Sequence, residues 1–276
     1  MTSSPRSASN TSPVVGLVAA AGTASRLGSL PCSKEIYPVD WDHSSSVEKP
    51  HPKVASHYLF DHYRRTGIDT VYVVLRDGKW DIPSYWGDGH RAGVNLAYLM
   101  MRAPYGTPFT LNQAYPFVRD CRVAMGFPDI LFAPKDAYAQ LLDHQEKTGA
   151  DVVLGLFPAH RPEKVDMVEV DEDGRPQHFL IKPKETTLIY TWICAVWGPR
   201  FTFYLHTLIA EVEPDWPSGE ELFLGEVFQR ALSDDIEIDA VCFPDGTYTD
   251  IGTPEELAAI AEWEGMGRLA QAEMAE

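Results

Sequence analysis

A loop of small residues follows the first apolar segment of the chain and leads to two basic side chains. Residues 14–19 are VVGLVA, and residues 20–28 are AAGTASRLG. An apolar, β-branched run that ends in small residues predicts a buried strand whose loop exposes backbone N–H groups at a sheet edge. Arg26 and Lys34 would add the two positive charges that a triphosphate needs. The pattern predicts phosphate binding by Ala20, Ala21, Gly22, Thr23, Ala24 and Ser25.

Other interpretations of these residues differ in their support. An ordinary turn between a strand and a helix would also explain the loop if it stood alone. The loop lacks the spacing of a P-loop and of a dinucleotide-binding fingerprint. The nine histidines form no H-E-x-x-H motif, and G-x-S-x-G is absent, so neither zinc nor hydrolase chemistry is indicated.

The continuation of the loop resembles the signature of the sugar-nucleotide pyrophosphorylases, which are sugar-1-phosphate nucleotidyltransferases. The two halves of that signature are AGTASRL at 21–27 and SKEIYPV at 33–39. Later pieces follow in order: MGFPDIL places Asp129, and YTDIGTPEEL places Asp250, where the family carries metal-binding aspartates. The segment GEELFLGEVFQRAL at 219–232 resembles a family helix less specifically. The resemblance extends from about residue 14 to 262 and is looser in the middle.

The resemblance implies a reaction and roles for the charged residues. An oxygen of an acceptor phosphate attacks the α-phosphorus of a nucleoside triphosphate, and pyrophosphate leaves. Arg26 would act on the leaving pyrophosphate and Lys34 on the triphosphate, while Asp129 and Asp250 would hold Mg²⁺ through hard oxygen ligands. Lys182 resembles the family lysine that holds the acceptor phosphate, although a solvated lysine on a strand edge is the alternative.

The base pocket departs from the family pattern. Where the family tends to place a glutamine, MMRAPYGTP has Met101, and it retains Gly106. A thioether cannot reproduce the paired hydrogen bonds of an amide. Met101 is therefore either part of a looser nucleotide-binding slot or ordinary apolar packing. Backbone groups near Ala20 and Gly106 would still recognise a uracil or thymine, which favours UTP or dTTP.

The acceptor pocket departs further. Asp166 stands where thymidylyltransferase-like members have a glycine, and Leu180 removes a carboxylate that would bind sugar hydroxyls. Glu169, Lys182 and Trp192 are the candidate acceptor-binding residues, with Trp192 either stacking on the acceptor or packing in the core. The changes favour a modified or less polar phosphate, such as a deoxy-sugar or cyclitol phosphate.

These residues need a scaffold, and the hydrophobic pattern supplies one. Apolar runs at 14–19, 70–75, 95–101, 122–127 and 151–157 alternate with segments of helical spacing, among them 53–66 and 134–149. A hairpin about an Asp-Gly turn is predicted from 164, followed by a strand at 191–197, helices near 200–212 and 219–232, a strand at 236–243 and a helix from Pro254. The expected fold is α/β, a Rossmann-like αβα sandwich with a mixed, mainly parallel sheet of the nucleotide-diphospho-sugar transferase type.

The domain prediction is a disordered leader at 1–13 and a single nucleotidyltransferase domain at 14–276. Its nucleotide-binding part covers about 14–130 and its acceptor-binding part about 131–262. The segment WDHSSSVEKPHPK at 41–53 replaces a shorter family segment and is either a flap or a subunit contact.

Composition limits the partners. The chain has 40 acidic and 23 basic residues, so its net charge of −17 repels a nucleic acid polymer, but a triphosphate neutralised by Mg²⁺ remains possible. The four cysteines have no metal-site or disulfide-scaffold spacing, and no apolar run is long enough to span a membrane. We therefore expect a cytoplasmic protein. A homo-oligomer is compatible with the sequence.

Two alternatives stay open at this stage. One is a cytidylyl- or guanylyltransferase that acts on a cyclitol or alcohol phosphate. The other is a catalytically weak homologue that binds nucleotides as a regulatory subunit.

Overall fold

A computed structural model describes residues 12–42, 51–101, 105–213 and 220–260 of the chain. Most of the predicted leader, most of the 41–53 segment and everything after residue 260 lie outside these residues. Within them, no helix is long and apolar enough to cross a membrane.

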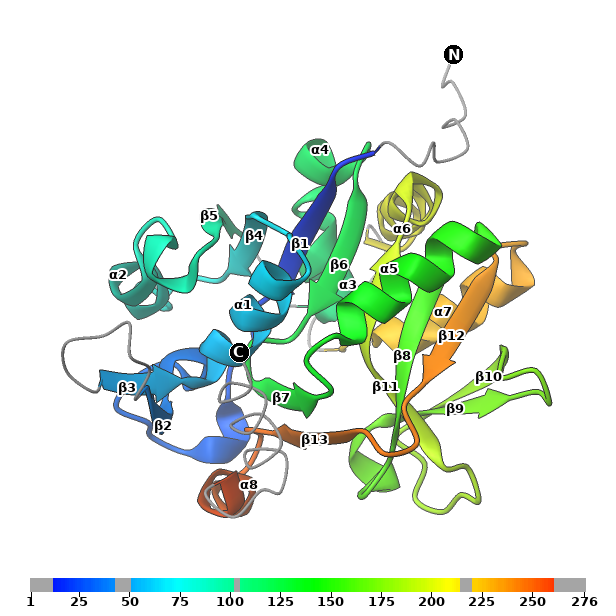
Figure 1. Ribbon diagram of the computed structural model, residues 1–276. Helices are drawn as coiled ribbons and strands as arrows, with labels where there is room; N and C mark the ends of the chain where they lie inside the picture. Colours follow the sequence, from blue (N-terminus) through cyan, green and yellow to red (C-terminus); the bar gives the residue numbers. More distant parts are fainter. Residues whose placement is uncertain (1–11, 43–50, 102–104, 214–219, 261–276) are drawn as a thin grey trace.

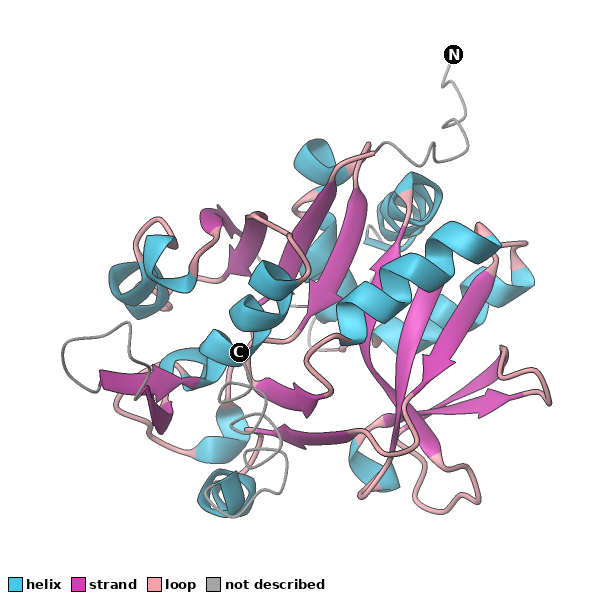
Figure 2. Cartoon of the chain, viewed as in Figure 1, coloured by secondary structure: helices cyan, strands magenta, loops and turns pink. Residues whose placement is uncertain are grey.

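The secondary structure alternates strands and helices through most of the chain (Figures 1 and 2). The strands are β1 (Val14–Ala19), β2 (Pro38–Asp42), β3 (His51–Val54), β4 (Thr70–Leu75), β5 (Asn95–Met100), β6 (Arg122–Gly126), β7 (Ile130–Ala133), β8 (Val152–Pro158), β9 (Asp166–Val170), β10 (Pro176–Ile181), β11 (Tyr190–Trp197), β12 (Ile238–Cys242) and β13 (Thr247–Asp250). The helices are α1 (Ala55–Arg65), α2 (Asp81–Trp86), α3 (Thr107–Asn112), α4 (Tyr115–Val118), α5 (Ala137–Thr148), α6 (Pro199–Val212), α7 (Leu224–Ser233) and α8 (Pro254–Ala259).

The central sheet is mixed. In the described residues it has nine strands along the path β10-β9-β11-β6-β1-β4-β5, with β8 pairing β11 and β12. The strands β6, β1, β4 and β5 run parallel to their neighbours in that series, as do β8 and β12. β11 runs antiparallel to β6, β8 and β9, and β9 and β10 form the hairpin. The expectation of a mixed, mainly parallel sheet is confirmed.

The sheet is covered on both faces because its central strands are apolar on both sides. Val15 and Leu17 of β1 belong to the core cluster that contains apolar side chains of α3, α4, α6 and α7. Val18 belongs to a second cluster, which contains side chains of α1, α2 and α5. A strand buried on both faces appears in sequence as a continuous apolar run, which is what VVGLVA is. The result is three layers, helices, sheet and helices.

Most predicted elements are present with small shifts at their ends. The strands at 14–19 and 70–75 have the predicted bounds, whereas the helix predicted at 134–149 covers Ala137–Thr148. The short elements β2, β3, β7, β13, α2, α3 and α4 were not predicted. Each has only four to six residues, too few to show a clear hydrophobic period.

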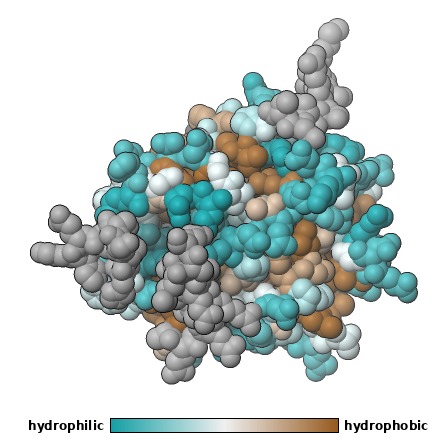
Figure 3. Space-filling model, in the orientation of Figure 1, coloured by the Kyte–Doolittle hydropathy of each residue, from teal (hydrophilic) through white to brown (hydrophobic). Residues whose placement is uncertain are grey.

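The surface agrees with the acidic composition. In the orientation of Figure 3, hydrophilic residues cover much of the visible face, with separate hydrophobic areas between them. All four cysteines are free thiols.

Candidate functional site

The loop that follows β1 lies at the carboxyl edge of the parallel strands. β1 is flanked by β4 and β6, both parallel to it, with Val18 opposite Val73 and Gly126. The N–H of Ala20 donates to the carbonyl of Val74 at 3.0 Å, which holds the start of the loop against β4. Ala24 has a positive φ of 52°, so the chain turns sharply before the short helix at 25–27 that carries Arg26. The sequence therefore places the loop where open α/β sheets bind ligands.

A separate two-stranded ribbon brings the two aspartates together. β7 and β13 pair antiparallel with Asp250 opposite Ile130, the residue after Asp129. The N–H of Ile251 also donates to the backbone carbonyl of Asp129 at 2.9 Å. β7 follows β6 in the middle of the chain, whereas β13 follows β12 near the end of the described residues. Asp129 and Asp250 are therefore far apart in sequence, and the ribbon makes them neighbours.

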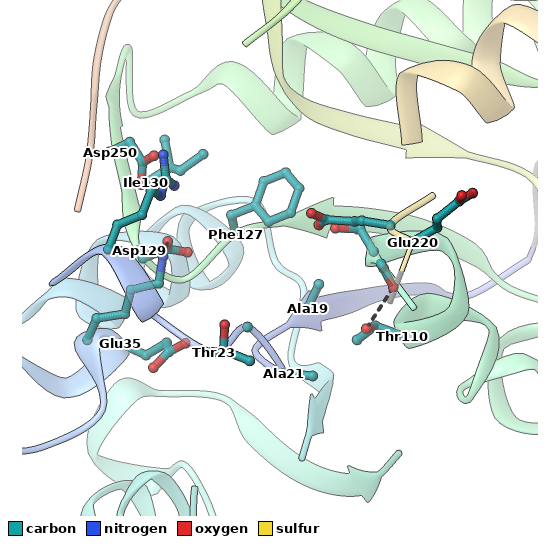
Figure 4. Close-up of a pocket in the computed structure, with 16 residues that line it drawn as sticks. Ala19, Ala21, Thr23, Glu35, Thr110, Phe127, Asp129, Ile130, Glu220 and Asp250 are labelled. Carbon is teal, nitrogen blue, oxygen red and sulfur yellow. Dashed lines mark hydrogen bonds and ion pairs between the residues drawn. The ribbon is translucent and has the colours of Figure 1, made fainter. Parts of the chain in front are cut away.

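These pieces enclose a cavity of about 430 Å³, which we call the site cavity. Figure 4 shows Asp129 and Asp250 on one side of it, Thr110 and Glu220 on the other, and Phe127 between them. Arg26 and Lys34 line it as well. The remaining lining residues are Ala19, Ala21, Gly22, Thr23, Glu35, Gly106, Thr107, Ile130 and Glu221.

The charged groups in the site cavity act on one another. Lys34 forms an ion pair with Asp129, and both side chains are mostly buried. Burial alone would lower the pKa of the Lys34 ammonium, but attraction by Asp129, Asp250 and Glu35 outweighs burial and raises it. Burial and then the charge of Asp129 raise the pKa of Asp250 to about 7, although Lys34 and Arg26 act in the opposite direction. The site keeps the Lys34 ammonium in its charged form, and it places the carboxyl groups of Asp129 and Asp250 where they repel each other.

Gly252 gives the Arg26 guanidinium room beside Asp250. A Cβ atom on Gly252 would stand 2.8 Å from an oxygen of Asp250, 3.0 Å from one of Glu256 and 3.2 Å from a guanidinium nitrogen of Arg26. Any side chain at this position would therefore displace at least one of these three charged groups. This close approach explains the glycine in the D-x-G-T segment better than turn formation does.

The donor set fits a divalent cation that is completed by substrate. Asp129 and Asp250 offer hard oxygen ligands on one wall, and a cation between them would relieve their repulsion. Within the described residues no group of three or more His, Cys, Asp or Glu side chains could hold a metal. A cation here would take its other ligands from phosphate oxygens and water, which is how Mg²⁺ is commonly bound.

The two nucleotide-binding candidates outside the loop, Gly106 and Met101, lie in different surroundings. Gly106 lines the site cavity, and it pairs with Leu222 in an isolated parallel bridge. Met101 is not among the described residues that line the cavity. It is 6% exposed, belongs to the core, and its sulfur accepts a hydrogen bond from the hydroxyl of Thr110 at 3.2 Å. The structure thus places Met101 as packing behind Thr110.

The acceptor-binding candidates also lie off the wall of the site cavity. Trp192 is 7% exposed and packs against Phe127 and against Phe228 of α7. Glu169 is exposed on β9. Lys182 is exposed with a positive φ of 44°, and its ammonium lies 3.8 Å from the centre of the Phe223 ring. The structure therefore brings none of the three onto the cavity that holds Lys34 and the aspartates.

Several cavity residues were missed by the sequence analysis. Glu35 stands inside the recognised signature, yet nothing in the sequence indicates that its side chain is buried. Thr107 and Thr110 follow Gly106, and a hydroxyl-bearing segment after a glycine is a signal that could have found them. Lys79, the buried partner of Glu35, had no sequence signal, because the pair depends on contact across 44 positions of the chain.

Comparison with known proteins supports a single family. The sequence model of the family described as "Nucleotidyl transferase" matches residues 41–264, which begins after the loop and lysine signature. The chain is 25% identical to the low-salt glycan biosynthesis nucleotidyltransferase Agl11 of Haloferax volcanii, over 88% of this chain and 63% of that protein. It is 21% identical to a glucose-1-phosphate thymidylyltransferase of Streptomyces antibioticus, over 70% of this chain and 52% of that protein. A mannose-1-phosphate guanylyltransferase of Mycobacterium tuberculosis is 26% identical over 72% of this chain and 53% of its own length.

The chain thus spans between about half and about three fifths of the length of these relatives. Solved structures agree on the fold. A protein from Bacillus anthracis assigned as a glucose-1-phosphate thymidylyltransferase, in complex with a sucrose, gives a TM-score of 0.74 at 18% identity, covering 90% of this chain and 94% of that one. The inositol-1-phosphate CTP transferase from T. maritima gives 0.67 at 18% identity, covering 91% and 97%. The architecture is that of the Rossmann-like nucleotide-diphospho-sugar transferases.

Proposed function

The chain belongs to the nucleotidyl transferase family, and from that premise we propose that it couples a nucleoside triphosphate to a sugar 1-phosphate or a related phosphorylated metabolite. The observation that carries the proposal is the convergence of Arg26, Lys34, Asp129 and Asp250 on one cavity. A triphosphate and its acceptor need charge compensation and alignment rather than a covalent intermediate. Two cations and two carboxylates at a sheet edge provide both.

The mechanism follows from where the charges lie. An acceptor phosphate oxygen attacks the α-phosphorus, the bond from that phosphorus to the bridging oxygen breaks, and pyrophosphate takes the bonding electrons. Lys34, held in its charged form, would bind the triphosphate, and Arg26 would stabilise the charge that develops on pyrophosphate. Asp129 and Asp250 would hold Mg²⁺, which supplies neutralisation of phosphate charge when bound. The α-phosphorus would therefore react near Asp129, between the two cationic side chains.

For the nucleotide we propose dTTP or UTP. Ala19 at the end of β1, Ala21 in the loop after it and Gly106 line the site cavity. Backbone N–H and C=O groups can pair with the alternating donor and acceptor edge of uracil or thymine. Met101 lies behind this wall, so it contributes shape to the pocket rather than a hydrogen bond.

One observation favours a second candidate, a cytidylyl- or guanylyltransferase acting on a cyclitol or alcohol phosphate. Glu220 and Glu221 line the same cavity. Figure 4 shows Glu220 on the side opposite the aspartates. A carboxylate accepts hydrogen bonds from the exocyclic amino groups of cytosine and guanine, which uracil and thymine lack. The two candidates differ in base and share the chemistry.

The activity is tested in two steps. Thermal unfolding with ATP, CTP, GTP, UTP and dTTP, each with Mg²⁺, identifies the nucleotide, because a ligand stabilises by RT ln(1 + [L]/Kd). Pyrophosphate release is then measured with that nucleotide and glucose 1-phosphate, a deoxy-sugar 1-phosphate, inositol 1-phosphate and an alcohol phosphate. Turnover with none of them, together with tight nucleotide binding, would instead support a regulatory nucleotide-binding homologue.

The cation site has its own test. We expect Mg²⁺ to raise the melting temperature of the parent protein and to have little effect on Asp250→Asn, which lacks one of the two carboxylates. In metal-free buffer Asp250→Asn should be at least as stable as the parent, because it removes a buried charge that Asp129 repels. Asp173→Asn, on the exposed β9–β10 turn, is the control and should keep the Mg²⁺ response. An unchanged response in Asp250→Asn would place the cation elsewhere.

The single domain with nucleotide-binding and acceptor-binding parts, the homo-oligomer and the cytoplasmic location remain predictions from sequence. Sedimentation of the purified chain tests the oligomer directly.

A further inference from the structure

Two side chains from the segment after β4 hold the residues on either side of Lys34. Asp81 accepts two hydrogen bonds from Ser33, one from its N–H at 2.6 Å and one from its hydroxyl at 2.8 Å. Lys79 forms an ion pair with Glu35, and these side chains are only 4% and 2% exposed. Lys34 lies between these two fixed points, at the start of the short helix at 34–36.

Glu35 is also a potential competitor for Lys34. It lines the site cavity, and its charge acts on the Lys34 ammonium together with those of Asp129 and Asp250. One of its carboxylate oxygens accepts from Lys79, while the other is buried without a hydrogen-bond partner. A buried carboxylate that loses its counterion is strongly destabilised until it takes up a proton or another cation approaches it. The structure offers Lys34 as that cation.

We propose that Lys79 and Asp81 are positioning residues for Lys34, and that Lys79 keeps Glu35 from drawing the Lys34 ammonium away from Asp129. Asp81 fixes the backbone before Lys34, and Lys79 pairs with one oxygen of the carboxylate after it. The consequence for turnover rests on the proposed function, whereas the consequence for the position of Lys34 does not.

The proposal predicts a specific rescue. Lys79→Met should lower kcat for pyrophosphate release by about 10²-fold, comparable to losing one charged contact to the transition state. Lys79→Met combined with Glu35→Gln should regain at least tenfold of that loss, because the competing charge is gone. A role in fold stability alone would instead leave kcat unchanged in the folded fraction of Lys79→Met. All rates are therefore taken below the melting temperature of each variant.

Asp81→Ala and Arg200→Met complete the set. Asp81→Ala removes both hydrogen bonds to Ser33 and should raise KM for the nucleotide and lower kcat, and it remains available if Lys79→Met fails to fold. Arg200→Met breaks the ion pair between Arg200 and Asp151, neither of which lines the site cavity, and should keep the parent kcat. Parent-like kcat in both Lys79→Met and Asp81→Ala, or a double variant as slow as Lys79→Met, would overturn the proposal.

A crystal structure of Lys79→Met separates this inference from the activity. We expect the Lys34 ammonium to lie within hydrogen-bond distance of Glu35 rather than Asp129. If Lys34 stays on Asp129, the inference is wrong whatever the rates are. If Lys34 moves but the parent protein releases no pyrophosphate with any nucleotide and acceptor, the inference stands and the proposed function is wrong.

Discussion

Arg26 is more accessible than Lys34, the other cationic side chain that lines the site cavity. It is exposed, whereas Asp129 is buried and Lys34 is only 14% exposed. An accessible guanidinium can follow a departing pyrophosphate, while a buried ammonium held by Asp129 cannot move far. The two cations are therefore suited to different steps, Lys34 to ground-state positioning and Arg26 to charge that develops in the transition state.

Replacement of Arg26 tests this division. We expect Arg26→Ala to lower kcat by about 10²–10³-fold, with a smaller change in KM for the nucleotide, because the lost contact strengthens only as pyrophosphate leaves. Steady-state pyrophosphate release measures both constants. Arg175→Ala, an exposed arginine at the β9–β10 turn, should leave them unchanged. Full turnover by Arg26→Ala would remove Arg26 from the reaction.

Asp166 is a second residue whose environment is unusual. Burial raises the pKa of its carboxyl group to about 6, although Lys182 and the N–H of Gly225 act in the opposite direction. The carboxylate is therefore destabilised in the folded protein relative to the unfolded chain.

The sign of the pH dependence follows from that pKa. Because the folded pKa lies above the unfolded value of about 4, the stability that the proton supplies is complete below about pH 4 and is lost as the pH rises through about 6. Asp166→Asn should thus resemble the parent at pH 4 and exceed its unfolding free energy by about 1–3 kcal/mol at pH 8. Urea denaturation across this range, with Asp173→Asn as control, measures it. A gain that does not change with pH would show that Asp166 is not the titrating group.

At the scale of elements, the site depends on backbone pairings between segments that are far apart in sequence. The β7–β13 ribbon brings Asp250 beside Asp129, and the bridge from Gly106 to Leu222 closes the opposite wall. Gly106 has a φ of 116°, and a Cβ atom there would stand 2.2 Å from the carbonyl oxygen of Leu222. Only glycine permits this approach.

Gly106→Ala should therefore damage both stability and nucleotide binding. We expect a loss of at least about 2 kcal/mol in unfolding free energy, from the strained φ and the backbone clash together, and a weaker thermal shift with the preferred nucleotide. Gly149→Ala is the matched control. It also has a positive φ, but nothing lies within 4 Å of the added Cβ, so it should lose about 1 kcal/mol and keep nucleotide binding. Equal effects of the two variants would show that the bridge does not shape the site.

At the scale of the whole molecule, the net charge of −17 is the dominant electrostatic feature. Carboxylates repel one another across the surface, and they also repel an approaching triphosphate, so the cations of the site cavity act against the general field. This arrangement favours ligands that arrive with Mg²⁺ and disfavours polymeric nucleic acid.

The self-repulsion predicts a response to salt. Raising NaCl from about 0.01 to about 0.15 M shortens the Debye length from about 30 to about 8 Å. We expect the melting temperature in metal-free buffer to rise by about 2–4 °C, as about 1 kcal/mol of repulsion is screened in a chain of this size. Scanning calorimetry with EDTA present checks this. A melting temperature that falls with salt would show that attractive pairs, and not repulsion, dominate the surface.

The sequence alone predicted the layered α/β fold and four of the charged residues that line the site cavity, Arg26, Lys34, Asp129 and Asp250. Apolar runs such as VVGLVA encode strands buried on both faces, and the signature with the D-x-G-T segment identified Arg26, Lys34 and Asp250. These features are local, because a strand, a loop and a motif each depend on neighbouring residues. The short elements that join them left too little pattern to be predicted.

Only the tertiary structure decided which side chains share the cavity. It grouped Glu35, Thr110 and Glu221 with the signature residues, and it placed Met101 and Trp192 in packed surroundings away from the cavity wall. It also revealed that Lys79 and Asp81 hold the residues on either side of Lys34. Contacts of this kind arise when the sheet and its ribbon bring distant segments together, and the energy of a buried charge depends on partners that the linear order of residues does not specify.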